Sequence, residues 1–292
     1  MTLPGAFFLA AWAVRTALPG PPGPGELEIV VIDVGYGDAL LLRSAAAGDW
    51  LIDTGYPERY GEVEAALRER GVDRLDAILI THPHPDHMGG AARAAAEFRP
   101  RRVFDNGRPP PPGLSPEMWR EYLEIFRSHP GYSVLRPGPL PGWNGGTAAV
   151  VGVGGVGEVN ADSAVIRLEH AGRTVLLTGD LNRKGEEKLL AEGAVLGADL
   201  LKVGHHGAAD SSSARFLAAV APRWAAVSTG ANSWGAPDPE TIRRLEAAGT
   251  RVARTDRDGT LTFRIRADGE IWLYTRGFSP LILGRRFRLR PD

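Results

Sequence analysis

The sequence predicts an α/β fold in which two mixed β-sheets pack face to face and helices cover their outer surfaces. Strand patterns fall into two groups, and helical patterns follow the strands of each group, which favours a layered sandwich. Strands are expected over residues 27–34, 39–43, 50–53, 76–81, 148–153, 164–169, 173–178, 200–203, 225–228, 260–265 and 270–274. Helices are expected over residues 61–70, 90–97, 117–128, 184–192, 213–220 and 239–248.

The local patterns behind these elements are of two kinds. Residues 76–81 form a compact apolar run that ends in a polar residue, as is typical of a buried strand. In the helix expected over 61–70, Val63, Ala66 and Leu67 share one face. Proline-rich stretches at 109–112 and 137–143 bracket an irregular excursion.

The composition limits the chemistry of the protein. Lys and Arg total 34 and Asp and Glu total 35 among 292 residues, which argues against a chain whose whole surface wraps nucleic acid. No cysteine is present, which excludes thiolate catalysis, disulfide bonds, iron–sulfur clusters and cysteine-ligated zinc. The length suits one large domain, because no second compositional block separates from it.

Both ends of the chain are expected to lie outside the main domain, which we place over residues 26–276. Residues 6–14 are an unbroken apolar run, shorter than the ~20 residues of a spanning helix but as long as a signal-peptide core. Residues 1–18 are therefore a candidate signal or membrane tether, which favours an exported or membrane-associated location over a cytoplasmic one. A helix packed on the domain and a mis-assigned start are the alternatives. Residues 19–25 are expected to form a Pro/Gly linker and 277–292 a basic tail.

Residues 81–90 hold the strongest functional signal. Three histidines and an aspartate fall within six residues directly after a predicted strand: His82, His84, Asp86 and His87. Residues two apart in an extended segment point the same way, so His82 and His84 can converge on one metal while Asp86 and His87 reach a second. Imidazole and carboxylate without thiolate suit Zn²⁺, with Mn²⁺ or Fe²⁺ as alternatives.

Two later strand ends carry further candidate ligands. Asp180 follows Leu-Thr-Gly, and its carboxylate can bridge two cations because the glycine lets the backbone approach closely. His205 and His206 end another strand in Lys-Val-Gly-His-His-Gly. Because three predicted strands end in this way, we expect the metal-binding side chains to meet at one edge of the sheets. The sequence leaves open which of His205 and His206 is the ligand.

These motifs together resemble the metallo-β-lactamase-fold hydrolases. His82-x-His84-x-Asp86-His87 is similar to the signature of that family, and the order of the motifs resembles the ComEC-like competence group, the hydrolase modules attached to DNA-uptake channels. The motifs lie at residues 33–38, 51–55, 82–87, 160–163, 177–180, 202–207 and 256–259, the last expected as a hairpin. The resemblance implies an αββα sandwich with two divalent metal ions at the top edge of the sheets. It implies as ligands His82, His84, Asp86, His87, Asp180 and one of His205 and His206.

The sequence departs from that family at three places. Tyr36 stands where the family usually has Gln, and Ala236 stands where many members have His. If that His normally holds substrate phosphate, its loss alters nuclease activity and leaves metal binding intact. The third His of classical metallo-β-lactamases, between the His-rich motif and the bridging Asp, has no clear counterpart, because His129 and His170 are expected at the surface.

The candidate catalytic residues are Asp86 and His206. Asp86 is expected both to bind metal and to orient the attacking hydroxide, and whichever of His205 and His206 is not a ligand is expected to stabilise developing negative charge. Lys202, Asn160 and Ser163 are candidate substrate-binding residues, with a salt-bridged surface position as the alternative for Lys202. The candidates for a supporting role behind the ligands are Asp33, Asp38 and Asp53, although Asp53 is equally expected to hydrogen-bond its own turn.

We therefore expect a dinuclear metal-dependent hydrolase that acts on a phosphodiester, most directly a DNA nuclease. The same chemistry serves a small ester, lactone or phosphocholine-type substrate, and a catalytically weak binding module of this fold is a further alternative. The expected partner is accordingly nucleic acid or a small phosphodiester or ester. Trp119, Trp143 and Trp234 are either core and loop anchors or platforms that stack on bases.

Overall fold

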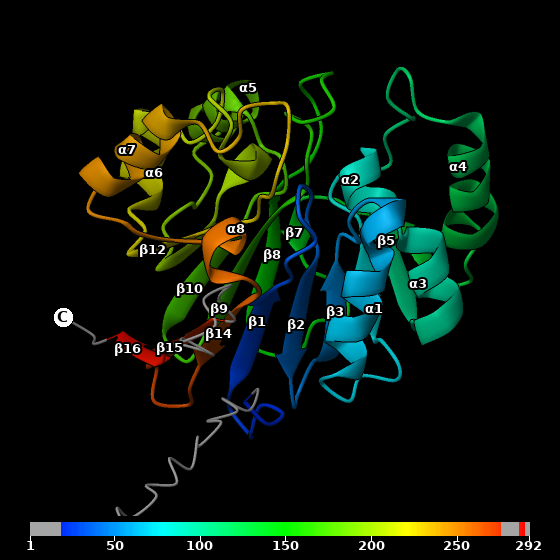
Figure 1. The fold of residues 1–292 in the computed structure, drawn as a ribbon, viewed down its shortest axis with the longest axis horizontal. Coiled ribbons are helices and arrows are strands. Elements are labelled where there is room, and N and C mark those ends of the chain that lie inside the picture. The colour runs from blue at the N-terminus through cyan, green and yellow to red at the C-terminus, as the bar shows by residue number, and fades with distance from the viewer. Residues whose placement is uncertain (1–18, 276–285, 290–292) are drawn as a thin grey trace, which may run out of the picture.

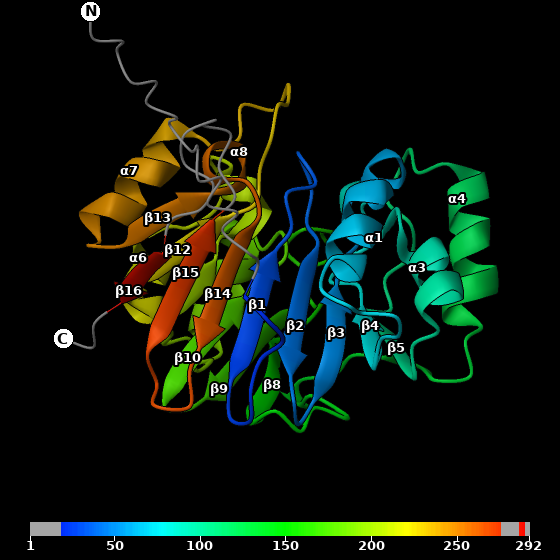
Figure 2. The same cartoon turned by 60° about the horizontal axis from the view of Figure 1, so that its bottom comes forward.

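In the computed structural model, which describes residues 19–275 and 286–289, two sheets face each other and helices flank both outer surfaces (Figures 1 and 2). Within these residues the first sheet has nine strands in the order β16-β15-β14-β1-β2-β3-β4-β5-β6. The second has seven, in the order β13-β12-β11-β10-β9-β8-β7. Both sheets mix parallel and antiparallel pairs. The predicted αββα sandwich is confirmed.

The strands of the first sheet are β1 (Leu27–Val31), β2 (Leu40–Ser44), β3 (Gly48–Ile52), β4 (Ala77–Leu79), β5 (Arg102–Asp105), β6 (Tyr132–Val134), β14 (Leu261–Ile265), β15 (Ile271–Thr275) and β16 (Arg286–Leu289). Those of the second are β7 (Gly138–Pro139), β8 (Thr147–Gly152), β9 (Val165–His170), β10 (Arg173–Leu177), β11 (Leu200–Lys202), β12 (Trp224–Val227) and β13 (Arg251–Arg254). The helices are η1 (Pro57–Arg59), α1 (Tyr60–Arg68), α2 (Pro85–Met88), α3 (Ala91–Phe98), α4 (Pro116–Glu121), η2 (Tyr122–Arg127), α5 (Arg183–Ala191), η3 (Gly204–Gly207), α6 (Ala214–Val220), α7 (Pro239–Ala247) and α8 (Thr255–Asp258).

The inner strands of the first sheet are buried on both faces. In β1, Ile29 and Val31 point into the core between the sheets, whereas Val30 points into the core under the helices. The same alternation holds in β4, where Leu79 faces the other sheet and Ile78 faces the helices. A strand with two buried faces reads as a continuous apolar run, which is why these strands are visible in the sequence.

The helices bury one face each against the sheets. Leu67 of α1 and Phe98 of α3 pack under the first sheet, and Leu189 of α5, Phe216 of α6 and Leu245 of α7 pack on the second. Their amphipathic spacing follows the 3.6-residue period that the sequence shows.

Several elements differ from the sequence-based expectation. Strands β5, β6, β7 and β13 were not predicted, because each has at most four residues and lacks a continuous apolar run, and each pairs with a neighbouring strand. The hairpin expected over 256–259 is wrong, since α8 occupies this segment and ends at Gly259, whose φ of 65° favours glycine. Part of the expected tail is strand β16, which pairs with β15.

The expected linker lies at the edge of the described structure. Residues 19–25 form neither helix nor strand, as predicted, and they contact the domain through Arg264 Nη2, which donates to the carbonyl oxygen of Gly20 at 2.6 Å. The expected signal or tether at residues 1–18 lies outside the described residues. Across the described ranges, no helix has the length and apolarity needed to cross a membrane.

Strand direction fixes where the functional side chains gather. The pairs β3–β4, β4–β5, β10–β11, β11–β12 and β12–β13 are parallel, and the carboxyl ends of parallel strands meet at one edge of a sheet. The loops that follow β3, β4, β10 and β11 therefore lie at one edge of the sandwich, where Figure 1 places α2.

Candidate metal centre

Among the described residues, three groups of side chains could hold a metal ion, and two of them share Asp180, while the third consists of Asp38, Asp53 and His87. His82, His84 and Asp180 form the first group, with donor atoms within 4.8 Å of one another. The second group, within the same limit, consists of Asp86, His87, Asp180 and His206. The structure thus brings the four residues of the His-rich motif together with Asp180, which belongs to both groups.

The first group is built on the end of β4. His82 is fully buried, and its Nε2 lies 3.0 Å from His84 Nδ1 and 3.7 Å from Asp180 Oδ2. The backbone of His84 is extended, with φ −80° and ψ 149°. His82 and His84 are two residues apart in an extended segment, so their rings turn toward the same point.

The second group is made by the turn into α2 and by the ends of β10 and β11. His206 Nε2 lies 3.1 Å from Asp86 Oδ2 and 3.4 Å from Asp180 Oδ1. His87 Nε2 lies 3.1 Å from Asp180 Oδ1 and 3.7 Å from Asp86 Oδ2. All four side chains are buried, so bulk water does not screen their charges.

The structure separates His205 from His206, which the sequence could not do. His206 is fully buried inside the second group. His205 points elsewhere, with Nδ1 2.9 Å from Asp210 Oδ1 and Nε2 3.1 Å from Asn160 Nδ2. Both residues have positive φ, 48° and 51°, because the chain turns sharply between Gly204 and Gly207. His205 therefore lies outside both groups of candidate ligands.

The electrostatics of the cluster favour bound cations. Burial alone would raise the pKa of Asp180, but the imidazoles of His206 and His87 outweigh it and hold this pKa well below its usual range. Burial would lower the pKa of His206, yet Asp180, Asp38 and Asp86 raise it to about 10. His87 shows the same balance, with a pKa well above the ordinary value. The buried carboxylates of Asp38, Asp86 and Asp180 therefore stabilise positive charge between them, whether it is carried by imidazolium or by a bound cation.

The donor set fits divalent metal. Asp180 Oδ1 and His87 Nε2 are buried with no hydrogen-bond partner, because their 3.1 Å contact lacks hydrogen-bond geometry. Unsatisfied buried polar atoms are rare unless an ion or water completes them. Four carboxylates are buried in this region, those of Asp38, Asp53, Asp86 and Asp180, and the one buried ammonium among the described residues, that of Lys202, pairs with Asp38. Imidazole and carboxylate donors in this number suit Zn²⁺, Mn²⁺ or Fe²⁺.

Two of the three predicted supporting aspartates stand behind ligand side chains. Asp53 Oδ2 lies 2.8 Å from His87 Nδ1 and also accepts from the Thr81 hydroxyl at 2.7 Å. Asp38 Oδ1 lies 3.5 Å from His206 Nδ1. Such contacts fix the orientation of a metal-binding imidazole. Asp33 instead accepts from the backbone N–H of Gly35 at 3.1 Å and contacts none of the candidate ligands.

Two of the predicted substrate-binding residues lie beneath the cluster, which corrects the expectation. Lys202 is only 2% exposed, and its Nζ lies 2.9 Å from Asp38 Oδ2. A surface position for this lysine is therefore also wrong. Ser163 is fully buried and its hydroxyl accepts from the backbone N–H of Asp180 at 3.2 Å. Only Asn160 reaches the rim, beside His205.

Sequence reasoning missed two residues at the site. The ring of Tyr36 lies 4.4 Å from the ring of His206, and burial, followed by the charges of Asp180 and Asp86, raises the pKa of its phenol. Ser228, at the end of β12, accepts from His206 Nδ1 through its carbonyl and donates its hydroxyl to the Gly37 carbonyl at 2.7 Å. In the sequence, Tyr36 stands out only because the family usually has Gln at this position. Ser228 lies in no motif, so the sequence gives no sign of its role.

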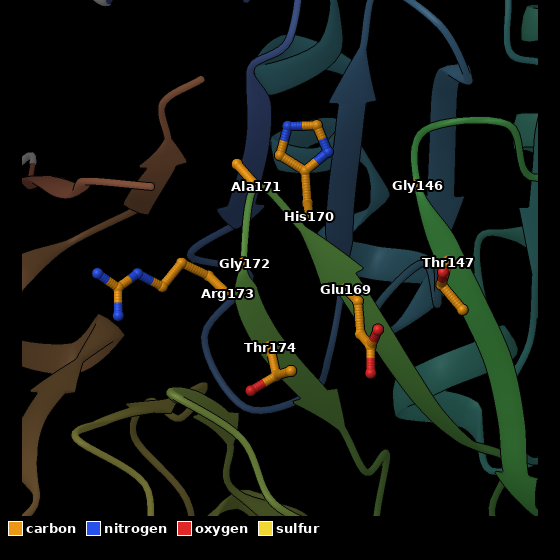
Figure 3. Close-up of a pocket in the computed structure, with 8 residues that line it drawn as sticks. All are labelled: Gly146, Thr147, Glu169, His170, Ala171, Gly172, Arg173 and Thr174. Carbon is orange, nitrogen blue, oxygen red and sulfur yellow. The ribbon is translucent and has the colours of Figure 1, made fainter. Parts of the chain in front are cut away.

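The remaining histidines lie away from the cluster, as expected. His170 occupies the β9–β10 turn, which lines a hollow at the opposite end of the second sheet (Figure 3). Its ring nitrogens lie 2.7 Å from the Gly145 carbonyl and 2.8 Å from the Gly25 carbonyl. Arg173, beside it, donates to the Gly269 carbonyl at 2.7 Å. His129 Nδ1 accepts from the backbone N–H of Gly131.

An αββα sandwich with a buried His/Asp cluster at the carboxyl ends of its strands has the architecture of a metal-dependent hydrolase. The family profile described as the metallo-beta-lactamase superfamily matches residues 32–230, and the chain belongs to this superfamily. Its members are generally metal-dependent hydrolases, so the enzyme class and the requirement for divalent metal ions follow from the family.

The chain is similar in sequence to curated proteins that include a competence protein. It is 31% identical over 286 residues to Competence protein ComA of Neisseria gonorrhoeae, covering 92% of this chain and 38% of the relative. It is 28% identical over 273 residues to ComE operon protein 3 of Bacillus subtilis, covering 82% and 33%. The chain thus spans about a third of the length of these relatives.

A solved structure that this chain resembles is Igni18, described as a novel metallo hydrolase from the hyperthermophilic archaeon Ignicoccus hospitalis. The two chains are 15% identical, with 81% of this chain and 98% of that chain covered and a TM-score of 0.48.

Proposed function

We propose that this domain is a dinuclear metal-dependent phosphodiesterase that cleaves nucleic acid. The observation that carries the proposal is the position of Asp180, whose carboxylate belongs to both groups of donors at once. A shared carboxylate is the arrangement expected between two neighbouring cations, and paired cations are well suited to phosphodiester cleavage.

In this proposal His82, His84 and Asp180 hold one ion, and Asp86, His87, His206 and Asp180 hold the other. When bound, the two cations would polarise the phosphoryl group and lower the pKa of a water molecule. Zinc is the metal that we expect, because the site offers imidazole and carboxylate and no thiolate.

The protein's own groups have distinct tasks. Asp86 is only 6% exposed, and we assign its carboxylate to orient the attacking water as well as to bind metal. Asp38, Asp53 and Ser228 fix the ring planes of His206 and His87 through the contacts described above. His206 is thereby kept in one orientation, which supports a role as ligand rather than as mobile proton carrier.

His205 and Asn160 form the substrate side of the site in this proposal. His205 keeps 23% of its side chain exposed, and Asp210 holds its ring. The Asp210 hydrogen bond and the charge of Asp180 outweigh burial and raise the pKa of His205. A polar pair at the rim, next to the metal ligands but outside them, is placed to contact a phosphate oxygen of the substrate.

Nucleic acid is the favoured substrate because two relatives that align over 92% and 87% of this chain are named Competence protein ComA and Recombination protein 2. The test is a hydrolysis panel with a single-stranded DNA oligonucleotide, bis-p-nitrophenyl phosphate and a lactone, each with metal-replete and chelator-treated protein. We expect metal-dependent cleavage of both phosphodiesters, lost in Asp180→Asn. If the protein hydrolyses the lactone faster than the phosphodiesters, the proposed substrate class is wrong, whereas the proposed metal ligands are unaffected.

A further inference from the structure

We infer that Trp234 is a stacking platform for an unpaired base of the nucleic-acid substrate, an inference that rests on the proposed function and narrows it to single-stranded substrates. Trp234 is 74% exposed. Within the described ranges its indole N–H has no hydrogen-bond partner and its ring makes no aromatic contact. The other two tryptophans considered from the sequence behave differently, since Trp143 is buried in the inter-sheet core and Trp119 packs against the core under the helices.

The loop that carries Trp234 stands beside the metal ligands. The loop begins at Gly230, which packs closely against the backbone of Gly35 and Tyr36. A Cβ added to Gly230 would lie 2.5 Å from Gly35 Cα and 2.9 Å from the backbone N of Tyr36. The loop ends at Pro237, which lies next to Gly207. A Cβ added to Gly207 would lie 2.9 Å from Pro237 Cβ. Gly207 follows His206, and the ring of Tyr36 lies on His206. Figure 2 shows this loop, in gold, rising beside the blue loop that follows β1.

The loop is held in one shape by a single side chain. The amide nitrogen of Asn232 donates to the carbonyls of Gly230 and Ala236, at 2.8 and 2.5 Å. Its amide oxygen accepts from the backbone N–H groups of Trp234 and Ala236, at 2.9 and 3.2 Å. Asp238 then caps α7 by accepting from Glu240 N and Thr241 N. The exposed indole is therefore presented by an ordered loop, which lowers the entropy cost of binding through it.

A nucleobase is the occupant that suits this position. Every base has a π-face that stacks on an indole whatever the sequence, and the loop borders the centre where we place the scissile phosphate. In a duplex the bases are stacked on one another inside the helix, so the indole reaches a base face only where the strand is unpaired. The phosphate and the base of one nucleotide segment would then contact the cluster and Trp234 together.

The test compares Trp234→Ala with Trp234→Phe on substrates that do and do not carry bases. We expect Trp234→Ala to raise KM for a single-stranded oligonucleotide by roughly 5- to 140-fold, with partial recovery in Trp234→Phe. Hydrolysis of bis-p-nitrophenyl phosphate, which has no base, should stay unchanged. Val195→Ala is the matched control, because Val195 is 66% exposed and precedes β11, at the opposite end of that strand from the cluster.

Three results would overturn the inference. They are an unchanged KM for single-stranded DNA, an equal loss on bis-p-nitrophenyl phosphate, and an effect on an abasic oligonucleotide as large as that on the intact one. If wild-type protein hydrolyses no phosphodiester, the proposed function fails, and stacking is judged by fluorescence alone. Of the seven tryptophans, only Trp234 should then be quenched by an oligonucleotide, so that Trp234→Phe abolishes the quenching.

Discussion

Lys202 Nζ lies 2.9 Å from Asp38 Oδ2, and both side chains are buried next to the candidate metal-binding cluster. Burial would raise the pKa of Asp38, but the charges of Lys202 and His206 outweigh it and lower this pKa to about 2. Asp38 in turn lies 3.5 Å from His206 Nδ1. The lysine therefore stabilises the aspartate that stands behind a candidate ligand.

Replacement of Lys202 by Met should destabilise the fold, because it leaves the Asp38 carboxylate buried without its counter-charge. The expected loss in free energy of unfolding is about 3–5 kcal/mol, measured by urea denaturation. Lys188→Met is the control, since Lys188 pairs with Glu192 near the surface and such pairs contribute about 0–1 kcal/mol. If Lys202→Met leaves the stability unchanged and raises KM for the phosphodiester substrate, Lys202 binds substrate instead.

The two groups of donors predict separate losses of metal. Metal-replete wild-type protein should retain close to two divalent ions per chain by elemental analysis. His84→Ala should lose one ion and His206→Ala the other, while both substitutions leave part of the site intact. His205→Ala should retain both ions, because this ring faces Asp210 and Asn160. Retention of no divalent metal by the wild type contradicts the whole assignment.

Asp53 should strengthen metal binding through its contact with His87, without itself being a ligand. Its carboxylate holds His87 Nδ1 at 2.8 Å, and loss of such a partner weakens binding by about 10- to 100-fold. Asp53→Asn should show this drop in competition titrations against a chromophoric chelator. Asp33→Asn serves as the control, since Asp33 bonds the Gly35 backbone and its replacement should leave the affinity unchanged.

Gly37 should be intolerant of any side chain. It has φ 128°, and an added Cβ would lie 2.7 Å from the carbonyl oxygen of Asp86. Gly37→Ala should therefore displace the segment that carries Asp86, lowering both the melting temperature and the metal content. Gly113→Ala separates the two causes, because Gly113 has φ 83° with open space around it. That control should cost only about 1–2 kcal/mol of backbone strain and retain its metal.

The main strands and most residues of the candidate metal-binding cluster could be predicted from the sequence for a local reason. Burial on both faces forces continuous apolar runs such as Ile29–Ile32 and Ile78–Ile80, and metal chemistry forces the clustering of His82, His84, Asp86 and His87. The Gly before Asp180 likewise marks a close approach, since its φ is 50° and an added Cβ would lie 2.8 Å from the Thr81 hydroxyl. These signals are contained within short stretches of chain.

The rest depends on contacts between distant segments. The choice of His206 over His205 follows from positive φ values at both residues, which send neighbouring rings in different directions, and no residue pattern reports this. Lys202 and Ser163 are buried in contact with residues from other segments, Asp38 and Asp180. Strands β5 and β13 exist only through their neighbours. The exposure of Trp234 is likewise set by the Asn232 hydrogen bonds, which form only when residues 230–236 fold back on themselves.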